Sequence, residues 1–292
     1  MKHKHGNEHG RTAETGHRHD HQGHAAHGPG HKTHFHDPEH AAEYHRRSAA
    51  GGIRAALTEK LVEMLALEGG ETVLDLATGT GRAARSVAAR LTSGTVVGVD
   101  QAMAMLQTGR EEKIEAYHVV AGEAGRLPFK TGVFDRAFVT FALHHFGDPE
   151  QVAREVLRVL KNGGTFVVLD PVVKEAKDAV DVALEARINQ VFRRTHGSDF
   201  RFHTASGIQR LLLKAGYRIV RGTVVSYPFD QEGMDGVPTG RHWLEAAEEL
   251  EREAPALAQR MRESYFTWHS HGDHVHVKGS FSYALVCAQK PA

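Results

Sequence analysis

The chain has 292 residues, of which 40% are hydrophobic and 25% charged, a composition ordinary for a globular protein. Its 36 Lys and Arg residues balance its 36 Asp and Glu residues, which argues against a general binder of nucleic acid or anionic membranes. One cysteine, Cys287, excludes an intramolecular disulfide framework. No apolar run approaches the ~20 residues of a membrane-spanning helix, so stable membrane insertion is not expected. No secretory signal opens the chain, and we expect a cytoplasmic protein.

Histidine is concentrated at the start of the chain, with 13 of the 23 histidines in the first 45 residues. Residues 1–33 contain too little apolar surface to offset the entropy of ordering, and we predict that they are a disordered tail. Neutral imidazoles on a flexible chain suit Ni²⁺, Zn²⁺, Co²⁺ or Cu²⁺. The alternatives are a solubilising extension or part of a purification tag. The candidate metal ligands are His17, His19, His21, His34 and His36.

Residues 34–292 are predicted to form one domain in which strands and helices alternate. Helical spacing is found at 53–67, 82–91, 102–113, 149–160, 175–194, 206–215 and 241–266. Short apolar runs predict strands at 72–77, 95–100, 117–120, 134–139, 165–170, 218–226 and 281–288. Apolar strands that alternate with helices indicate an α/β fold with a parallel sheet buried on both faces.

A glycine-rich turn follows the first predicted strand. Gly79-x-Gly81-x-x-Ala84, with Asp100 about 20 residues further on, fits the dinucleotide fingerprint. A tight strand-to-helix turn needs glycine in any doubly wound fold, so the turn alone is a weak signal. Asp75, inside the strand, would repel a pyrophosphate and suits a cationic amino group. Asp100 can accept hydrogen bonds from both hydroxyls of a ribose, so together they favour S-adenosylmethionine as the ligand.

Residues 73–81, Val-Leu-Asp-Leu-Ala-Thr-Gly-Thr-Gly, resemble motif I of class I S-adenosylmethionine-dependent methyltransferases. The subgroup that they most resemble includes ubiquinone and menaquinone C-methyltransferases. Ala77 and Asn162 stand where the family often has glycine and proline. The resemblance implies a Rossmann-like class I methyltransferase fold, with a seven-stranded, mostly parallel sheet and an antiparallel C-terminal hairpin. Further segments resemble the family in the same order, at 97–106, 121–129, 134–146 and 155–164.

The resemblance also implies which residues hold the cofactor. The glycine-rich turn and Asp75 would hold the methionine part, Asp100 the ribose, and Glu123 with Ala124 the adenine. The predicted cofactor residues are Asp75, Ala77, Gly79, Gly81, Asp100, Gln101, Met105, Gly122, Glu123, Ala124 and Thr140.

The loop after the fourth strand is expected to face the transferred methyl group, which makes His144 and His145 candidate general bases. Both could instead pack or orient a ligand. The partner is expected to be a small hydrophobic or aromatic methyl acceptor, quinone-like and methylated on carbon or oxygen. Segments 171–217 and 227–280 would cover it. Tyr44 could close over the site, although ordinary packing is the favoured interpretation.

Several activities are excluded or kept as alternatives. The loop after the fourth strand has no Asn/Asp-Pro-Pro-aromatic run and no cysteine, which argues against methylation of DNA bases. The balanced charge disfavours RNA, so no nucleic-acid partner is expected. One alternative is a metal-homeostasis protein that uses the fold as a ligand-binding scaffold. Another is a nicotinamide-dependent reductase.

A second histidine cluster spans residues 269–276. Gly272-Asp273 is typical of a turn, and His274-Val275-His276-Val277 alternates like a half-exposed strand. The favoured interpretation is an exposed strand face beside a turn. The alternative is a metal site near the substrate cover, formed by His269, His271 and His274.

Overall fold

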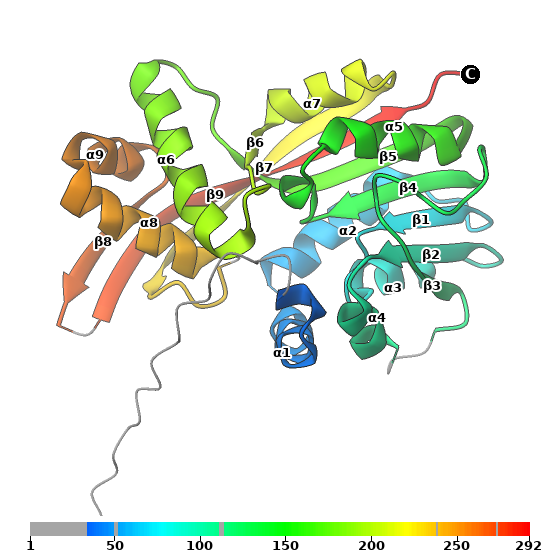
Figure 1. The fold of residues 1–292 in the computed structure, drawn as a ribbon, viewed down its shortest axis with the longest axis horizontal. Helices are drawn as coiled ribbons and strands as arrows, with labels where there is room; N and C mark the ends of the chain where they lie inside the picture. The colour runs from blue at the N-terminus through cyan, green and yellow to red at the C-terminus, as the bar shows by residue number, and fades with distance from the viewer. Residues whose placement is uncertain (1–33, 50–51, 111–113, 238, 273) are drawn as a thin grey trace, which may run out of the picture.

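The structure, a computed structural model, describes residues 34–49, 52–110, 114–237, 239–272 and 274–292 (Figure 1). Its centre is one sheet with the strand order β3-β2-β1-β4-β5-β9-β7. Strands β1 to β5 pair in parallel, and β9 is antiparallel to both β5 and β7. The strands span Thr72–Leu76 (β1), Thr95–Asp100 (β2), Tyr117–Ala121 (β3), Phe134–Thr140 (β4), Leu160–Val173 (β5), Arg218–Glu232 (β7) and His274–Gln289 (β9). The predicted mostly parallel sheet with an antiparallel C-terminal hairpin is confirmed; seven strands form its main path, and two further strands bring the described sheet to nine.

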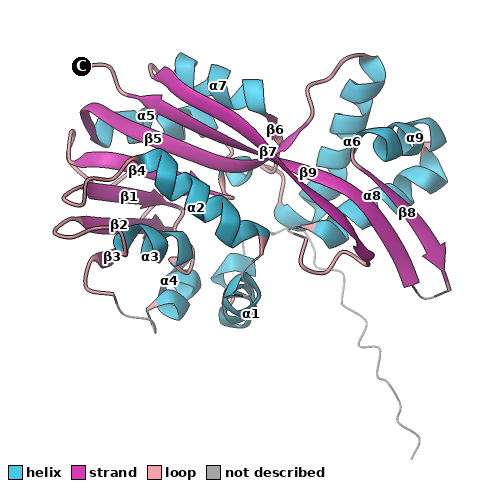
Figure 2. Cartoon of the chain, turned by 180° about the vertical axis from the view of Figure 1, so that it is seen from behind, coloured by secondary structure: helices cyan, strands magenta, loops and turns pink. Residues whose placement is uncertain are grey.

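Helices cover both faces of this sheet (Figure 2). On one face lie α2 (Ile53–Leu65) and α3 (Arg82–Ala88), and on the other α5 (Pro149–Val159) and α7 (Ala205–Lys214). Successive side chains of a strand point to opposite faces. Val73 accordingly joins the core under α2 and α3, whereas Leu74 joins the core under α5 and α7. Burial on both faces explains why the parallel strands are continuous apolar runs.

Strands β7 and β9 continue past the central sheet and form an arm with β8 (Phe266–His271). Three helices pack on one side of the arm, α6 (Ala179–His196), α8 (Gly240–Glu253) and α9 (Pro255–Ser264) (Figure 1). Its core is aromatic and buried, and includes Phe192, Trp243, Phe266 and Phe281. A two-residue strand, β6 (His203–Thr204), pairs with the end of β5.

The arm contains most of the wrong element boundaries. The single helix predicted at 241–266 is two helices, because Pro255 cannot donate the backbone hydrogen bond that would continue α8. The strand predicted at 281–288 begins at His274, and the strand predicted at 165–170 spans Leu160–Val173. The strands β6 and β8 were not predicted.

The N-terminal part of the described chain covers one edge of the fold. A 3₁₀ turn, His34–His36, leads into α1 (Pro38–Ala49), which lies against α4 (Met103–Gly109). Ala41 packs with Ala102 and Met105, and Phe35 and Tyr44 pack beside them. The tail predicted at 1–33 lies outside the described residues. Among the helices that the structure describes, none is long and apolar enough to cross a membrane.

Candidate active site

A cavity of about 3120 Å³ opens at the carboxyl ends of the parallel strands. We distinguish two parts of it. The strand-end pocket is bounded by Gly79, Asp100, Met105, Gly122 and Thr140. The aromatic pocket, on the side of the arm, is bounded by His145, His196, Phe202, Trp243 and Tyr283. In a parallel α/β sheet, ligands bind outside the carboxyl ends of the strands, so this is the expected place for a site.

The turn after β1 has an unusual backbone. Ala77, Gly79 and Gly81 all have positive φ, at 54°, 57° and 76°. A Cβ on Gly81 would lie 2.7 Å from Cε1 of Tyr117, so only glycine allows α3 to approach β3 this closely. Ala77 accepts a left-handed backbone at a cost of about 1–2 kcal/mol, and it lines the cavity. Strain of this kind typically collects at functional sites.

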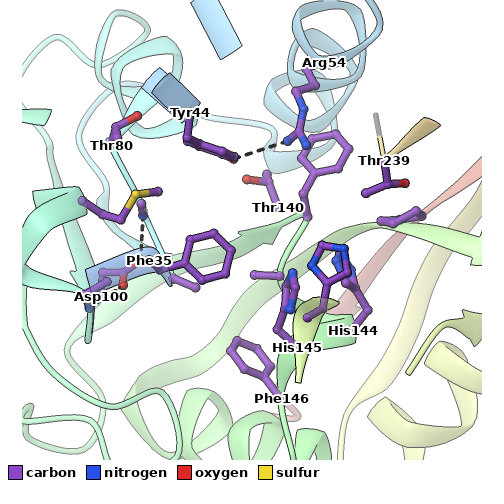
Figure 3. Close-up of a pocket in the computed structure, with 18 of the residues that line it drawn as sticks. Phe35, Tyr44, Arg54, Thr80, Asp100, Thr140, His144, His145, Phe146 and Thr239 are labelled. Carbon is purple, nitrogen blue, oxygen red and sulfur yellow. Dashed lines mark hydrogen bonds between the residues drawn. The ribbon is translucent and has the colours of Figure 1, made fainter. Parts of the chain in front are cut away.

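Asp100, at the end of β2, ties the turn to the start of α4. Its Oδ2 accepts a hydrogen bond from the Gly79 backbone N–H at 2.8 Å, and its Oδ1 accepts one from the Ala102 N–H at 2.9 Å (Figure 3). Burial raises the pKa of this carboxyl, against the effect of the two amides. A carboxylate oxygen has two lone-pair sites, so each oxygen keeps the capacity to accept a further bond from a ligand in the cavity.

Asp75 lies behind the turn and does not line the cavity. Its Oδ2 accepts the Thr78 hydroxyl at 2.5 Å, and Thr78 is also 2.9 Å from the Tyr117 hydroxyl. Its Oδ1 is buried and has no hydrogen-bond partner among the described residues. Desolvation raises the pKa of Asp75 to about 8. Asp75 therefore supports the turn from below, and its contact with an amino group stays a prediction.

The remaining predicted cofactor residues lie together. Ala77, Gly79, Asp100, Gln101, Met105, Gly122, Glu123, Ala124 and Thr140 all line the cavity. Gly81, like Asp75, does not, because its role is to let the helix pack closely.

His144, which lines the cavity between the two pockets, forms a buried pair with Asp170. His144 lies on the 3₁₀ turn Leu143–His145 after β4, and its Nδ1 is 2.9 and 3.0 Å from the two carboxylate oxygens of Asp170. His144 is 4% exposed and Asp170 is fully buried. Burial raises the pKa of Asp170, against the lowering effects of the nearby His203 and of the backbone amides of the same turn, from Ala142 to His144. Because these donors converge on Asp170, we assign the imidazole proton to Nδ1 of His144.

The other ring nitrogen of His144 is then a hydrogen-bond acceptor. Burial lowers the pKa of His144, and the nearby Arg54 charge lowers it further, so the imidazole is neutral. The turn is fixed from the arm side, because the Arg201 N–H donates to the His144 carbonyl at 2.9 Å. His144 thus combines a fixed orientation with an unprotonated Nε2 at the cavity wall, which makes it a candidate general base.

Comparison with known proteins shows which proteins this chain resembles. The family model of a methyltransferase domain matches residues 74–168. Over 121 residues, the chain is 39% identical to demethylmenaquinone methyltransferase of Corynebacterium kroppenstedtii, covering 41% of this chain and 50% of that protein. Over 178 residues, it is 27% identical to the ubiquinone/menaquinone biosynthesis C-methyltransferase UbiE of Geobacter sp. strain M21, covering 55% and 76%.

A solved structure matches the fold over a larger part of the chain than the sequence relatives cover. Protein BH2331 of Bacillus halodurans superimposes with a TM-score of 0.64 at 24% identity, over 80% of this chain and 99% of that one. The chain carries a class I methyltransferase domain. The resemblance stated from motif I onward is thereby confirmed. The chain spans about half the length of the first curated relatives that it matches.

In the methyltransferase domain, His145 points toward the aromatic pocket. Its ring centroid lies 4.3 Å from that of His144, 5.5 Å from His196 and 5.7 Å from Phe35. Phe35 packs near Met105, so it lies between the strand-end pocket and the histidines (Figure 3). Tyr44 lines the cavity, packs beside Met105 and accepts a hydrogen bond from Arg54 at 3.5 Å, and its closure over a bound ligand stays a prediction.

Several residues of this site were not predicted from the sequence. Asp170 ends the predicted fifth strand, and a carboxylate at that position was the available signal. Phe202 and Trp243 belong to the predicted cover segments, but no local pattern brings them together. Their rings stack with centroids 5.5 Å apart, 41 positions along the chain from each other.

The predicted metal ligands do not form a site within the described part of the chain. His17, His19 and His21 lie outside the described residues. His36 is exposed, and of His34 only the backbone is described. His269, His271 and His274 are exposed on the β8–β9 hairpin, as the favoured interpretation of an exposed strand face expects, and they do not line the cavity. Among described residues, no three His, Cys, Asp or Glu side chains are gathered to hold a metal ion.

Proposed function

We propose that the chain is an S-adenosylmethionine-dependent methyltransferase for a small acceptor with an aromatic or apolar body. The observation that carries the proposal is Asp100, held by two backbone amides beside the Gly79 turn and facing the cavity. This arrangement suits a ribose diol, and the exposed Glu123 suits the exocyclic amine of adenine. Bound there, S-adenosylmethionine supplies an activated methyl carbon.

The chain itself then positions the methyl donor and the acceptor and takes up a proton. The strand-end pocket fixes the methyl donor, and the aromatic pocket holds the acceptor on the other side of His144 and His145. Alignment of two reactants can supply about 7–11 kcal/mol of the barrier. His144, oriented by Asp170, accepts the proton that the acceptor loses, which adds about 10²–10⁴-fold. His145 is the second candidate for this role.

A quinone-like ring is the acceptor that we favour. Relatives at 39% and 27% identity are named for menaquinone or ubiquinone methylation. The aromatic pocket supports the same choice, because Phe202, Trp243 and Tyr283 offer flat apolar surfaces to a planar ring. Methylation on carbon or on oxygen would both use a base at the position of His144.

The first test is methyl transfer from tritiated-methyl S-adenosylmethionine, with purified protein and an extract of the source cell. Label that partitions into organic solvent is expected with the wild-type chain and not with Asp100→Ala. Glu63→Ala, at an exposed position of α2 outside the cavity, is the matched control and should retain full transfer. No enzyme-dependent label in either phase would contradict the proposal.

The same samples test the two alternatives. A nicotinamide-dependent reductase would bind NADH and would not bind S-adenosylhomocysteine. A metal-handling scaffold would bind metal and cofactor but would show no turnover. The methyltransferase proposal requires tight S-adenosylhomocysteine binding, and activity that survives treatment with a chelator.

A further inference from the structure

The tip of the arm brings four histidines onto one face of a hairpin. In the register of β8 with β9, His269 is opposite His276, and His271 is opposite His274. The buried Trp268 and Val277, also opposite each other, point to the helix-covered side of the arm. Because side chains alternate along a strand, all four histidines point to the other side. Three are exposed, and His276 is half-buried.

The spacing of these positions suits chelation. Residues opposite each other in an antiparallel pair have Cβ atoms about 4.5–5.5 Å apart, and residues two apart on one strand are separated by about 7 Å. An imidazole nitrogen binds Zn²⁺ at about 2.0–2.1 Å, so the nitrogens of two ligands to one ion must approach to roughly 3 Å. Side chains of this length, attached at these separations, can meet at one ion by rotation about χ1 and χ2.

The side chain of Asp230 orients His276 for such a role. Its Nε2 lies 3.0 Å from Oδ1 of Asp230, which is on β7, and Lys278 lies 2.8 Å from the other oxygen of the same carboxylate. Asp230 thereby fixes the ring and places the proton on Nε2, which leaves Nδ1 as the ligand atom. Histidines that bind metals commonly donate their other N–H to a carboxylate in this way.

We propose that this hairpin face is a binding site for one borderline-soft divalent cation, Zn²⁺ or Ni²⁺. His276 and His269 are the principal ligands, His271 or His274 supplies a third, and water completes the coordination. The three exposed side chains rotate inward as the ion binds, because the described side chains do not yet converge on a metal position. The site is separate from the cavity, which none of these four histidines lines. The ion would link β8 to β9 and stiffen the arm.

The test uses the chain with the nine histidines of residues 1–33, and also His34 and His36, replaced by serine, so that the other candidate ligands cannot compete for metal. Titration with NiCl₂ and with ZnCl₂, followed by calorimetry, should show one equivalent bound. His269→Ala with His276→Ala should weaken that binding by at least tenfold. Asp230→Asn should weaken it by about 10–100-fold without removing any ligand. His118→Ala, at an exposed position of β3, is the matched control and should change nothing.

Two further readouts keep the outcome clear. Trp268 directly precedes His269, so bound Ni²⁺ should quench its fluorescence, and the double variant should lose that quenching. Unchanged S-adenosylhomocysteine binding would show that the double variant is folded. The proposal is overturned if the tail-substituted chain binds no equivalent of metal, or if the folded double variant binds it as tightly as before.

Discussion

The strand-end pocket and the aromatic pocket open into one cavity but are built in different ways. The strand-end pocket comes from short segments at the ends of β1, β2, β3 and β4. Asp100, for example, bonds to Ala102 two residues away and to Gly79, 21 residues away, in the turn that follows the neighbouring strand. The aromatic pocket assembles His145, His196, Phe202 and Trp243 from the loop after β4 and from the arm. The shape of the strand-end pocket is set mainly by the backbone, whereas the shape of the aromatic pocket is set by side-chain packing.

This structural difference should separate cofactor binding from acceptor binding. A pocket made of backbone amides and one carboxylate can keep the same cofactor when residues elsewhere in the chain are substituted. A pocket made of packed rings can change its acceptor by substitution without altering the sheet. We therefore expect substitutions in the two pockets to affect different kinetic parameters.

The largest expected effect comes from the residue between the two pockets. His144→Gln keeps a side chain of similar polarity but removes the base, so kcat should fall by about 10²–10⁴-fold. The dissociation constant of S-adenosylhomocysteine should stay within about twofold. Asp170→Asn should lower kcat in the same direction, because it disturbs the imidazole orientation. Equal kcat in His144→Gln and wild type would remove His144 from the mechanism and favour His145.

Asp100→Ala should act chiefly on cofactor affinity. It removes the carboxylate to which the two ribose hydroxyls would donate, and hydrogen bonds to charged groups contribute about 1.5–3 kcal/mol each. It also removes the two backbone N–H bonds that hold the Gly79 turn. Affinity for S-adenosylhomocysteine should fall by about 100-fold or more in calorimetry. Asp148→Ala, which also lines the cavity and caps α5, is the control for loss of a carboxylate. Equal losses in both variants would contradict a ribose-binding role for Asp100.

The two regions also differ in how well the sequence predicts them. Strands β1 to β5 were all found, because strands that are largely buried on both faces are apolar runs bounded by turn residues. Nine cofactor residues lie on the cavity, since the turn after β1 and the acidic end of β2 are local signals. The exceptions, Asp75 and Gly81, act from behind the turn.

The arm was harder to predict for a physical reason. Its long strands have solvent on one side and helices on the other, so their composition is mixed and their limits were underestimated. The contact of Phe202 with Trp243 depends on the packing of distant segments, which no periodicity records. The Asp170–His144 pair spans 26 residues, and it could be anticipated only from a carboxylate at a strand end.

A pair of glycine substitutions tests the packing of the turn. Gly81→Ala places a methyl group against the Tyr117 ring at φ 76°, whereas Gly132→Ala has a similar φ of 71° and nothing within 4 Å. Gly132→Ala should cost about 1–2 kcal/mol of the free energy of unfolding, from backbone strain alone. Gly81→Ala should cost about 1–3 kcal/mol more, from overpacking. Equal losses in urea denaturation would show that the contact with Tyr117 is easily relaxed.

The pH dependence of stability should report Asp75. The folded-state pKa of about 8 lies above the ordinary value of 3.8, so the folded chain retains a proton that the unfolded chain releases. This contribution is fully present below about pH 4 and is lost as the pH rises toward 8. Asp75→Asn should therefore reduce the decline in unfolding free energy across that window, by up to about 1.4 kcal/mol per pH unit. Parallel pH profiles for the variant and the wild type would contradict a protonated Asp75.

The smallest effect should come from the aromatic pocket, and it separates the two regions most directly. Trp243→Phe keeps a ring at the cavity wall but removes part of the surface that stacks on Phe202. The KM for the acceptor should rise by about three- to tenfold, equivalent to roughly 1 kcal/mol of lost ring contact. Cofactor affinity and kcat should change little, because Trp243 touches neither Asp100 nor His144 among its ring and hydrogen-bond contacts in the described structure. Trp268→Phe, on the far part of the arm, is the matched control and should leave the KM unchanged. If both tryptophan variants raised the KM equally, the arm would act on the acceptor through its overall stability, and the aromatic pocket would lose its assignment as the acceptor site.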